Sequence, residues 1–589
     1  PALTRLLKDE IEEVRVAAAY AIGQIGDGEA ESALINAYNN NDSTFQDQRF
    51  NATVLEAIGK CGDDASLRHL STIRTFTRKD TSLLEGQAWG IYRYALRGKV
   101  SPEGTATMGR FLLKRGFPES VRLIAANYLM RAKGIRLDTL TQPLAARIFT
   151  EQDTRLRMAL AIALGKSQSA TGRDTLLQLL GRERDYRVKC NIIKALGNYD
   201  YKVIREPLIE ALDDPNLHVA NTAAQFMVDH GIGRDASFYW SKAKQRDSLH
   251  WQVRTNLYGA AIKHMPPNFT DYKEAMNREI LRLIRLSNNQ YEKAAAIRAM
   301  GQYHWNYRNV HQFAYASEEP VVRTVGVESL AAIARLPDLQ NKFRGSTARV
   351  KKELIDFFIE AINKSDVAMV AVAAGALRTP QLEFRESVEN IGFLDAALAK
   401  LTLPKDTETA KELQRTINYY RTGEAGNIPP PAFNHPIEWR RIKALSGQSG
   451  ARIETSEGDI IITFLKDKAP VTVANFVQLA KEGFYKGKFV HRVVPNFVIQ
   501  TGCPRGDGYG SLNYSIRSEL PPFHYDKQGY VGMASAGNHT ECTQWFITHS
   551  PTPHLDGNYT AFAKVEEGMD VVHRLQQGDV IRDVKVIEF

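Results

Sequence analysis

Cysteine, long apolar runs and concentrated positive charge are all scarce in this sequence. Four cysteines occur in 589 residues, without a CxxC pair or zinc-finger spacing, so a disulfide-dense or zinc-finger protein is not expected. No run of about 18 apolar residues is present, so we expect no membrane span. The net charge of the chain is +9, and its positive excess is spread diffusely through residues 1–450, whereas a nucleic-acid binder usually gathers its positive charge in a patch.

The length is too great for one hydrophobic core, because single domains usually hold about 100 to 200 residues. Hydrophobic residues make up 43% and charged residues 24%, an ordinary globular composition. We therefore expect several domains or one long repeat array. The chain begins at Pro1 rather than Met, so we expect a fragment or a processed form, with any signal peptide lying before Pro1.

A short alanine-rich pattern that closes on glycine recurs through the N-terminal part. The closing residues Gly23 and Gly59 are 36 positions apart, and Gly165 and Gly197 are 32 apart. A period in the low to mid thirties is typical of stacked helical units. Clear copies are Val14–Gly23, Arg49–Gly59, Arg155–Gly165, Arg187–Gly197 and Lys293–Gly301.

Each copy has the spacing of an amphipathic helix. Ala18, Ala21 and Ile22 fall at i, i+3 and i+4, which makes an apolar stripe. We expect the closing glycine to end the helix in the left-handed conformation. A polar turn and a second helix follow, and neighbouring hairpins must stack to bury both faces.

This pattern resembles HEAT repeats, with about ten or eleven of them over roughly residues 1–400. Armadillo and tetratricopeptide arrays are the competing interpretations. The resemblance implies an all-α solenoid over residues 1–425 whose concave face binds unfolded proteins or one specific protein partner. Residues 426–449, which include the three prolines 429–431, cannot continue a helix and predict a semi-rigid connector.

The pattern of residues changes at residue 450, and residues 450–589 lack the helical repeat. Runs rich in β-branched residues alternate with turn residues, and two stretches have helical spacing. Many strands with two helices favour a closed β-barrel capped by those helices. The expected strands lie within 452–455, 459–464, 489–500, 531–535, 544–548, 560–565 and 584–589, and the expected helices are 469–480 and 569–576.

Three motifs in this region occur in the order found in one family. Phe489–Gly502 reads FVHRVVPNFVIQTG, Met533–Ile547 reads MASAGNHTECTQWFI, and His554–Tyr559 reads HLDGNY. They resemble the cyclophilin signatures FHRxxPxFxxQGG, MAxAGxxTxxSQFFI and WLDGxH. The region is therefore identified as a peptidyl-prolyl cis–trans isomerase domain of the cyclophilin type.

The resemblance implies the site residues. Arg492 corresponds to the catalytic arginine, and Gln500 orients it. No metal and no cofactor are implied, and the substrates are proline-containing peptides and unfolded or partly folded proteins. The implied substrate-binding residues are Phe497, Val498, Ala534, Ser535, Gln544, Phe546, His554, Leu555 and Tyr559.

Several positions depart from the common pattern. Val490 stands where phenylalanine is usual, and Thr501 replaces a glycine. Tyr559 stands where histidine is frequent, and His554 stands where cyclosporin-sensitive members carry tryptophan. Val498 replaces a frequent methionine, which should loosen the pocket slightly. None of these changes removes the arginine or the two phenylalanines, so we expect activity.

The residue types suit the reaction. Rotation about an amide costs about 18–20 kcal/mol because conjugation is lost, and X-Pro bonds exchange in tens to hundreds of seconds. The prolyl nitrogen of the twisted state becomes a hydrogen-bond acceptor. A fixed guanidinium near that nitrogen binds the twisted state better than either planar state, which is differential binding.

Two other functional classes were weighed. In a protein-binding scaffold both parts would only bind proteins, with residual isomerase activity; the complete set Arg492, Phe497, Gln500 and Phe546 argues against it. A HEAT-like lyase would show an acid- or cysteine-rich concave face. Cys503, His539, Cys542, His549 and His554 have no regular metal-site spacing.

The cellular setting is an expectation by analogy. The domain combination, Val498, Tyr559 and the short loop 503–510 are typical of bacterial members, so we expect a bacterial folding factor or chaperone. A cell-envelope location is expected if a signal peptide precedes Pro1, and a cytoplasmic one otherwise. The sequence leaves the compartment undecided.

Overall fold

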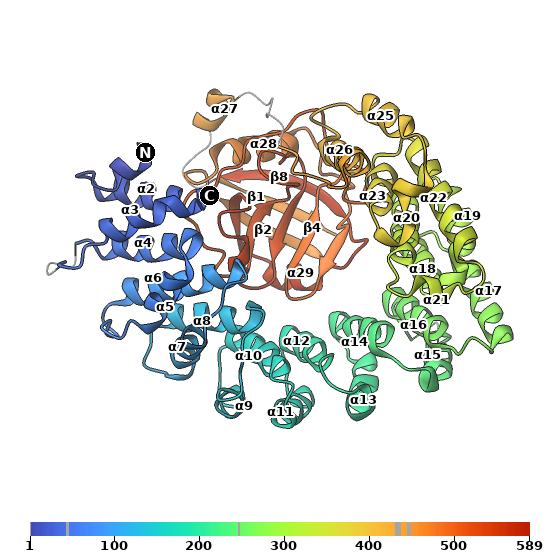
Figure 1. Cartoon of the computed structure of the whole chain (residues 1–589), viewed down its shortest axis with the longest axis horizontal. Coiled ribbons are helices and arrows are strands. Elements are labelled where there is room, and N and C mark those ends of the chain that lie inside the picture. The colour runs from blue at the N-terminus through green and yellow to red at the C-terminus, as the bar shows by residue number, and fades with distance from the viewer. Residues whose placement is uncertain (1, 43–45, 246–247, 430–436, 445–448, 589) are drawn as a thin grey trace. The chain divides into compact units, whose positions relative to one another are not determined.

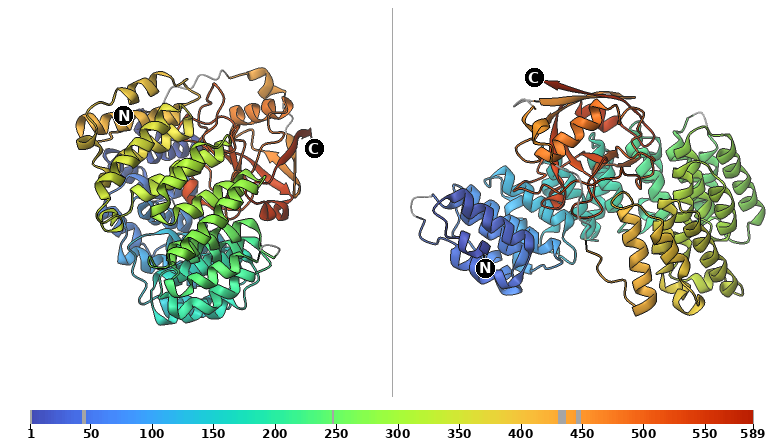
Figure 2. Two further views of the ribbon diagram at one scale, coloured as in Figure 1. Left: turned by 90° about the vertical axis from the view of Figure 1, so that its right-hand side faces the viewer. Right: turned by 90° about the horizontal axis from the view of Figure 1, so that it is seen from above.

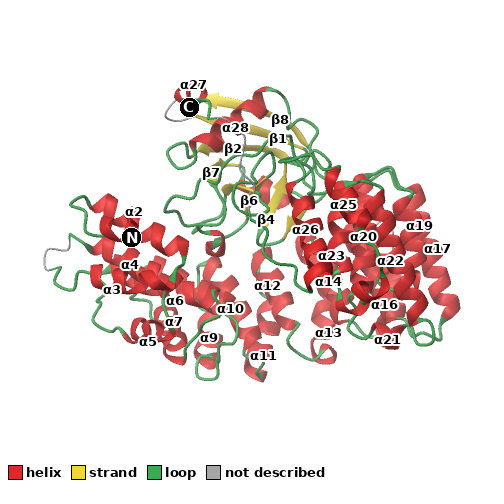
Figure 3. Cartoon of the chain, turned by 45° about the horizontal axis from the view of Figure 1, so that its top comes forward, coloured by secondary structure: helices red, strands yellow, loops and turns green. Residues whose placement is uncertain are grey.

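The computed structural model describes residues 2–42, 46–245, 248–429, 437–444 and 449–588. The chain divides into two compact units, residues 1–223 and 224–589 (Figure 1). Residues 2–422 are helical, whereas the strands all lie C-terminal to them (Figure 3). None of the described helices is both long enough and apolar enough to cross a membrane.

The first unit is a stack of helices in which each even-numbered helix from α2 to α10 packs against the next even-numbered one. α2 packs on α4, α4 on α6, α6 on α8, α8 on α10 and α10 on α12. The bounds are α1 Ala2–Leu6, α2 Glu12–Ile25, α3 Glu31–Ala37, α4 Gln48–Cys61, α5 Asp64–Thr72, α6 Thr81–Leu96, α7 Pro102–Leu113, α8 Glu119–Arg131, α9 Thr141–Ile148, α10 Thr154–Lys166, α11 Ala170–Leu180, α12 Tyr186–Leu196, α13 Tyr201–Glu210 and α14 Leu217–His230, which crosses into the second unit.

The repeat glycines serve helix packing rather than helix ends. Gly59 lies inside α4, where a Cβ would collide with the carbonyl of Gly90 in α6. Gly165 is inside α10, where a Cβ would come 2.6 Å from that of Ala195. Gly197 follows α12 but is right-handed, with φ −60°. None of these three glycines is left-handed, so the prediction of left-handed caps is wrong for them, and Gly59 and Gly165 instead allow close approach of the neighbouring helix.

The second unit continues the helical stack. α16 packs on α18, α18 on α20, α20 on α23 and α23 on α26. The left view of Figure 2 shows these helices side by side. Their bounds are α15 Ala236–Ala243, α16 Trp251–His264, α17 Thr270–Leu286, α18 Gln290–Gly301, α19 Tyr307–Tyr315, α20 Pro320–Ala334, α21 Leu339–Lys342, α22 Thr347–Asn363, α23 Val367–Leu377, α24 Phe384–Ser387, α25 Gly392–Ala399 and α26 Thr407–Thr422.

The connector is described only in part. Pro430 and Pro431 lie outside the described residues, as do the rest of 430–436 and residues 445–448. α26 ends at Thr422 and is capped by Gly423 in the left-handed conformation. A short helix, α27 (Trp439–Lys443), follows, and its Trp439 is exposed.

Residues 449–588 form an eight-stranded antiparallel sheet with the order β3-β4-β6-β5-β7-β2-β1-β8. Its ends meet through backbone bonds between residues 487–490 and 578–581, such as Val490 N to Asp579 O at 2.7 Å. The expected closed barrel with two helices is confirmed. The bounds are β1 Ser449–Thr455, β2 Gly458–Phe464, α28 Pro470–Lys481, β3 Arg492–Val494, β4 Val498–Thr501, β5 Tyr530–Met533, β6 Trp545–Thr548, β7 Ala561–Glu567, α29 Met569–Arg574 and β8 Ile581–Glu588.

Two apolar clusters result from strand alternation. Successive side chains of a strand point to opposite faces. Ile499 and Trp545 therefore join the large core with Phe476 of α28. Their neighbours Val498 and Phe546 join a smaller cluster on the other face. This second cluster marks the region where the signature residues gather.

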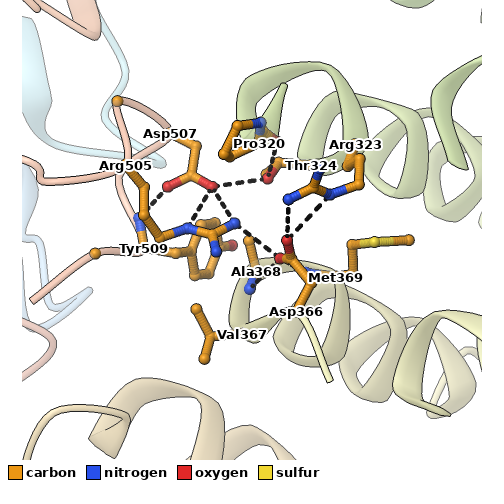
Figure 4. A network of polar contacts seen from close by, with 12 residues as sticks. Pro320, Arg323, Thr324, Asp366, Val367, Ala368, Met369, Arg505, Asp507 and Tyr509 are labelled. Carbon is orange, nitrogen blue, oxygen red and sulfur yellow. Dashed lines mark hydrogen bonds and ion pairs between the residues drawn. The ribbon is translucent and has the colours of Figure 1, made fainter. Parts of the chain in front are cut away.

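The barrel is docked on helices of the same unit through its loop 503–510. The Tyr291 hydroxyl of α18 donates to Gly506 O at 2.8 Å. The Asp507 carboxylate accepts from the Thr324 hydroxyl of α20 at 3.0 Å. Arg505 pairs with Asp366, which precedes α23, at 2.8 Å (Figure 4). Alternating strands and helices could be read from the sequence, but this contact could not.

Candidate active site

Three neighbouring strands place the central side chains in one row. Arg492 of β3 is directly opposite Gln500 of β4, and Gln500 is opposite Phe546 of β6. Directly opposed residues on antiparallel strands have Cβ atoms about 4.5–5.5 Å apart on one face. The register therefore brings together residues that are up to 54 positions apart in the sequence.

A series of hydrogen bonds through the side-chain amides of Gln500 and Gln544 supports Arg492. Arg492 Nη1 donates to Gln500 Oε1 at 3.4 Å, and Gln500 Nε2 donates to Gln544 Oε1 at 3.1 Å. Gln544 Nε2 donates to the carbonyls of Gly508 and Gly510 at 2.7 and 3.0 Å. Because each amide donates and accepts, the orientation of one fixes the next. The Arg492 guanidinium, always charged, thus has a supported position on an exposed face.

An apolar cluster lies beside this row. Val498, Phe546 and Leu555 are almost fully buried in the smaller cluster, and Phe497 and Tyr559 pack against it. The Arg492 guanidinium carbon is 6.0 Å from the Phe497 ring centroid. An apolar surface and a cation therefore lie side by side at the end of this row.

Two aromatic contacts complete this apolar surface. The His554 ring lies 5.2 Å from Phe497, and the Tyr559 ring meets the Phe546 edge at 5.9 Å. Edge-on and tilted ring pairs at these distances are favourable. His554 and Tyr559, which depart from the common motif, thus lie where the motif implies.

Ala534 and Ser535 follow β5 and face the side-chain amides of Gln500 and Gln544. Ala534 N donates to Gln544 O at 2.9 Å, which fixes this segment beside β6. Both residues line a cavity of about 220 Å³ with Gln500 and Gln544. The structure therefore places Phe497, Val498, Phe546, Leu555 and Tyr559 in one apolar cluster and Gln500, Ala534, Ser535 and Gln544 around one cavity, with Arg492 and His554 next to Phe497.

The residues that depart from the signature are accommodated by their surroundings in the structure. Val490 is buried in the main barrel core. The Thr501 hydroxyl donates to Phe489 O at 2.8 Å, so the extra polar group is satisfied. Cys503 and Cys542 are both free thiols. The Cys503 sulfur accepts from Gly508 N at 3.3 Å and Gly510 N at 3.4 Å, inside the docking loop.

Sequence reasoning missed two supporting residues. Tyr525 is fully buried, packs on Phe546 at 6.2 Å and donates to Tyr559 O at 3.2 Å. Gly532 leaves room for both, because a Cβ there would collide with the Phe546 ring. A signal for Gly532 was available, since it directly precedes the second signature, whereas Tyr525 lies in a stretch without a motif.

The comparisons with known proteins agree with this geometry. A model of the cyclophilin type peptidyl-prolyl cis-trans isomerase family matches residues 451–588. A peptidyl-prolyl cis-trans isomerase of Synechococcus elongatus is 45% identical over 139 residues, which are 23% of this chain and 95% of that protein. The chain belongs to the cyclophilin family.

Further matches fall on the same cyclophilin domain. Peptidyl-prolyl cis-trans isomerase B of Bacillus subtilis is 46% identical over 121 residues, or 20% of this chain and 85% of that protein. A crystal structure of a Cryptosporidium parvum cyclophilin is 29% identical, with a TM-score of 0.23, and covers 24% of this chain and 99% of that one.

The helical part also has a match. The HEAT repeat model matches residues 1–28, the first of the repeats that the sequence predicts. The chain therefore contains a cyclophilin-type peptidyl-prolyl cis-trans isomerase domain and an N-terminal HEAT repeat, a kind of repeat that often mediates protein interactions.

Proposed function

We propose that Arg492 is the catalytic residue of this isomerase and that the adjoining apolar pocket holds the substrate proline. The observation that carries the proposal is the row Arg492–Gln500–Phe546 across three paired strands. It sets a supported cation beside an apolar wall, which is the arrangement that rotation about an X-Pro bond needs.

The mechanism follows from the two parts of the site. Phe497, Val498, Phe546 and Leu555 hold the proline ring while the carbonyl side of the amide rotates. Arg492 donates to the prolyl nitrogen when conjugation is lost, so it binds the twisted state more tightly than the planar states. Each 1.36 kcal/mol of such preference increases the rate tenfold. Gln500 keeps the guanidinium aimed at that nitrogen.

The remaining residues bind the peptide on either side of the proline. Ala534 and Ser535 present main-chain groups to an extended peptide, and Gln544 borders its path. His554 and Tyr559 close the end of the proline pocket. These roles are supported by their common face and their contacts with Phe497, Phe546 and Gln500.

We assign residues 1–425 to a client- or partner-binding HEAT solenoid, 426–449 to a connector and 450–589 to the isomerase domain. Together they would act as a bacterial folding factor that isomerises prolines in proteins held by the solenoid. The match of the HEAT model and the bacterial relatives support this assignment.

The test is the Arg492→Ala variant of the whole chain in a proline-limited peptide assay. We expect kcat/KM to fall at least tenfold, about 1.4 kcal/mol, with the fold retained. Arg582→Ala, an exposed arginine of β8, is the matched control and should keep the full rate. An unchanged rate for Arg492→Ala would reject the assigned role.

A further inference from the structure

The cavity beside the catalytic row is walled by two different parts of the second unit. The barrel side contributes Gln500, Gln544, Ser535 and the loop residues 508–511. The other side is residues 404–409, the loop after α25 and the first turn of α26. The start of α26 and the loop before it therefore line a cavity that also borders Gln500 and Ser535 of the peptide site proposed above.

This second wall is fixed to the barrel. Lys411 Nζ of α26 donates to Ala536 O at 3.2 Å, directly after Ser535. Loop 503–510, which supplies Gly508 and Tyr509 to the cavity, is held by Asp366 and Thr324 (Figure 4). Contacts on both sides of the cavity thus hold the start of α26 and loop 503–510 in place around it.

Most acidic groups around this wall already have partners. Glu412 accepts from Arg378 at 2.5 Å and from Arg415 at 2.6 Å. Asp507 is paired with Arg505 at 2.8 Å. Asp406, which lines the cavity, accepts from Thr402 N at 2.9 Å.

Glu408 differs from these groups. It lines the cavity, and within the part of the chain that the structure describes its carboxylate makes no hydrogen bond or ion pair. The Glu408 side chain is exposed where it lines the cavity, so its carboxylate is open to solvent and to an incoming ligand. Lys405, exposed on the same loop, is the basic residue of this wall, beside the carboxylates of Asp406 and Glu408. A cation brought into the cavity would supply the partner that Glu408 lacks.

We propose that the first turn of α26 forms the outer wall of the peptide-binding groove and that Glu408 selects substrates with a lysine or arginine close to the proline. The proposal rests on the peptide site assigned above. In this arrangement the array determines which prolines the barrel accepts, in addition to any binding on its own surface. The ligand is the flanking side chain of the same peptide whose proline occupies the apolar pocket.

The test compares peptides in which Lys, Gln or Glu scans the three positions on each side of an Ala-Pro bond. In the full chain, one position should show a Lys-over-Gln preference in kcat/KM of about three- to fivefold, the size of one solvent-accessible ion pair. Glu408→Gln should abolish this preference while leaving the rate for the Gln peptide unchanged. Loss of all rates would instead point to a failure of the peptide site.

Lys405→Gln is the matched control, since it removes a charge of opposite sign from the same wall. It should keep the preference for the Lys peptide. A preference for Glu peptides that disappears in Lys405→Gln would show that the cavity selects anions and would overturn the proposal. The proposal also fails if no position gives a preference that depends on Glu408.

Discussion

Arg505 Nη2 of the barrel loop lies 2.8 Å from Asp366 Oδ1 at the start of α23. Both side chains are largely buried, and each has a second partner: Asp507 for Arg505 and Arg323 for Asp366. The barrel is thereby docked on the helices of its own unit. The same loop supplies the Gly508 and Gly510 carbonyls that hold Gln544, so docking and catalysis share one segment.

The first prediction concerns this shared segment. Arg505→Ala removes the pair with Asp366 and one partner of Asp507, so loop 503–510 should lose part of its support. We expect kcat to fall about two- to fivefold with little change in KM, because Gln544 and Gln500 position Arg492 rather than bind the whole peptide. Steady-state kinetics and hydrogen exchange in the loop measure both effects.

Arg452→Ala is the control for that variant. Arg452 forms an exposed pair with Asp459 at 3.0 Å on the barrel surface, and such pairs contribute about 0–1 kcal/mol. It should alter neither exchange in loop 503–510 nor kcat. If the Arg505→Ala protein kept a normal kcat and normal hydrogen exchange, the contact with Asp366 would not support the loop or contribute to catalysis.

The second prediction concerns the side-chain amides of Gln544 and Gln500. Gln544→Ala and Gln500→Ala should each lower kcat, because both interrupt the same support of Arg492. The double variant should cost little more than the worse single one, since groups that act as one unit are not additive. Full additivity in this double-mutant cycle would show that the two glutamines act separately.

The third prediction concerns stability against pH. Burial lowers the pKa of His491 to about 4, although Asp507 acts in the other direction. The unfolded chain binds this proton near pH 6.5 and the folded one near pH 4, so stability is lost as the pH falls through that window. The loss from this group is at most about 3 kcal/mol. His304, with a pKa of about 4, adds a similar dependence.

His491→Gln should reduce the difference between unfolding midpoints at pH 7 and pH 5 relative to the unmodified chain. Exposed His230 provides the control, and His230→Gln should leave that difference unchanged. If the unfolding midpoint fell equally between pH 7 and pH 5 with and without His491, other groups would be responsible for the loss of stability at low pH.

The fourth prediction uses His554. The resemblance implies that cyclosporin-sensitive members carry tryptophan at this position, and the His554 ring lies 5.2 Å from Phe497 at the pocket rim. Imidazole offers less stacking area than indole, so we expect weak inhibition that His554→Trp improves. An inhibitor titration of the isomerase assay measures this, and tight inhibition of the unmodified chain would contradict it.

Local patterns predicted much of this molecule, and long-range contacts did not. The alanine stripe around Ala18 predicts α2 because i, i+3 and i+4 spacing is a property of neighbouring residues. The motif order likewise indicates that Arg492 and Phe546 share a site. The Arg505–Asp366 pair joins residues 139 positions apart, and nothing near either one indicates the other. The glycines of the repeat were misassigned for the same reason, since their partners lie on the next helix.

The last prediction concerns division of labour. The domain has its own core, and the Synechococcus relative consists almost entirely of it, so residues 449–589 should fold alone and isomerise short peptides. Protein clients should differ, because a chain held by the solenoid presents its prolines to the tethered site at an effective concentration on the order of millimolar. The full chain should therefore accelerate proline-limited refolding more than the isolated barrel. Mixing the two halves as separate molecules should remove the gain. Equal rates for barrel and full chain across several clients would mean that the helices dock one specific partner instead.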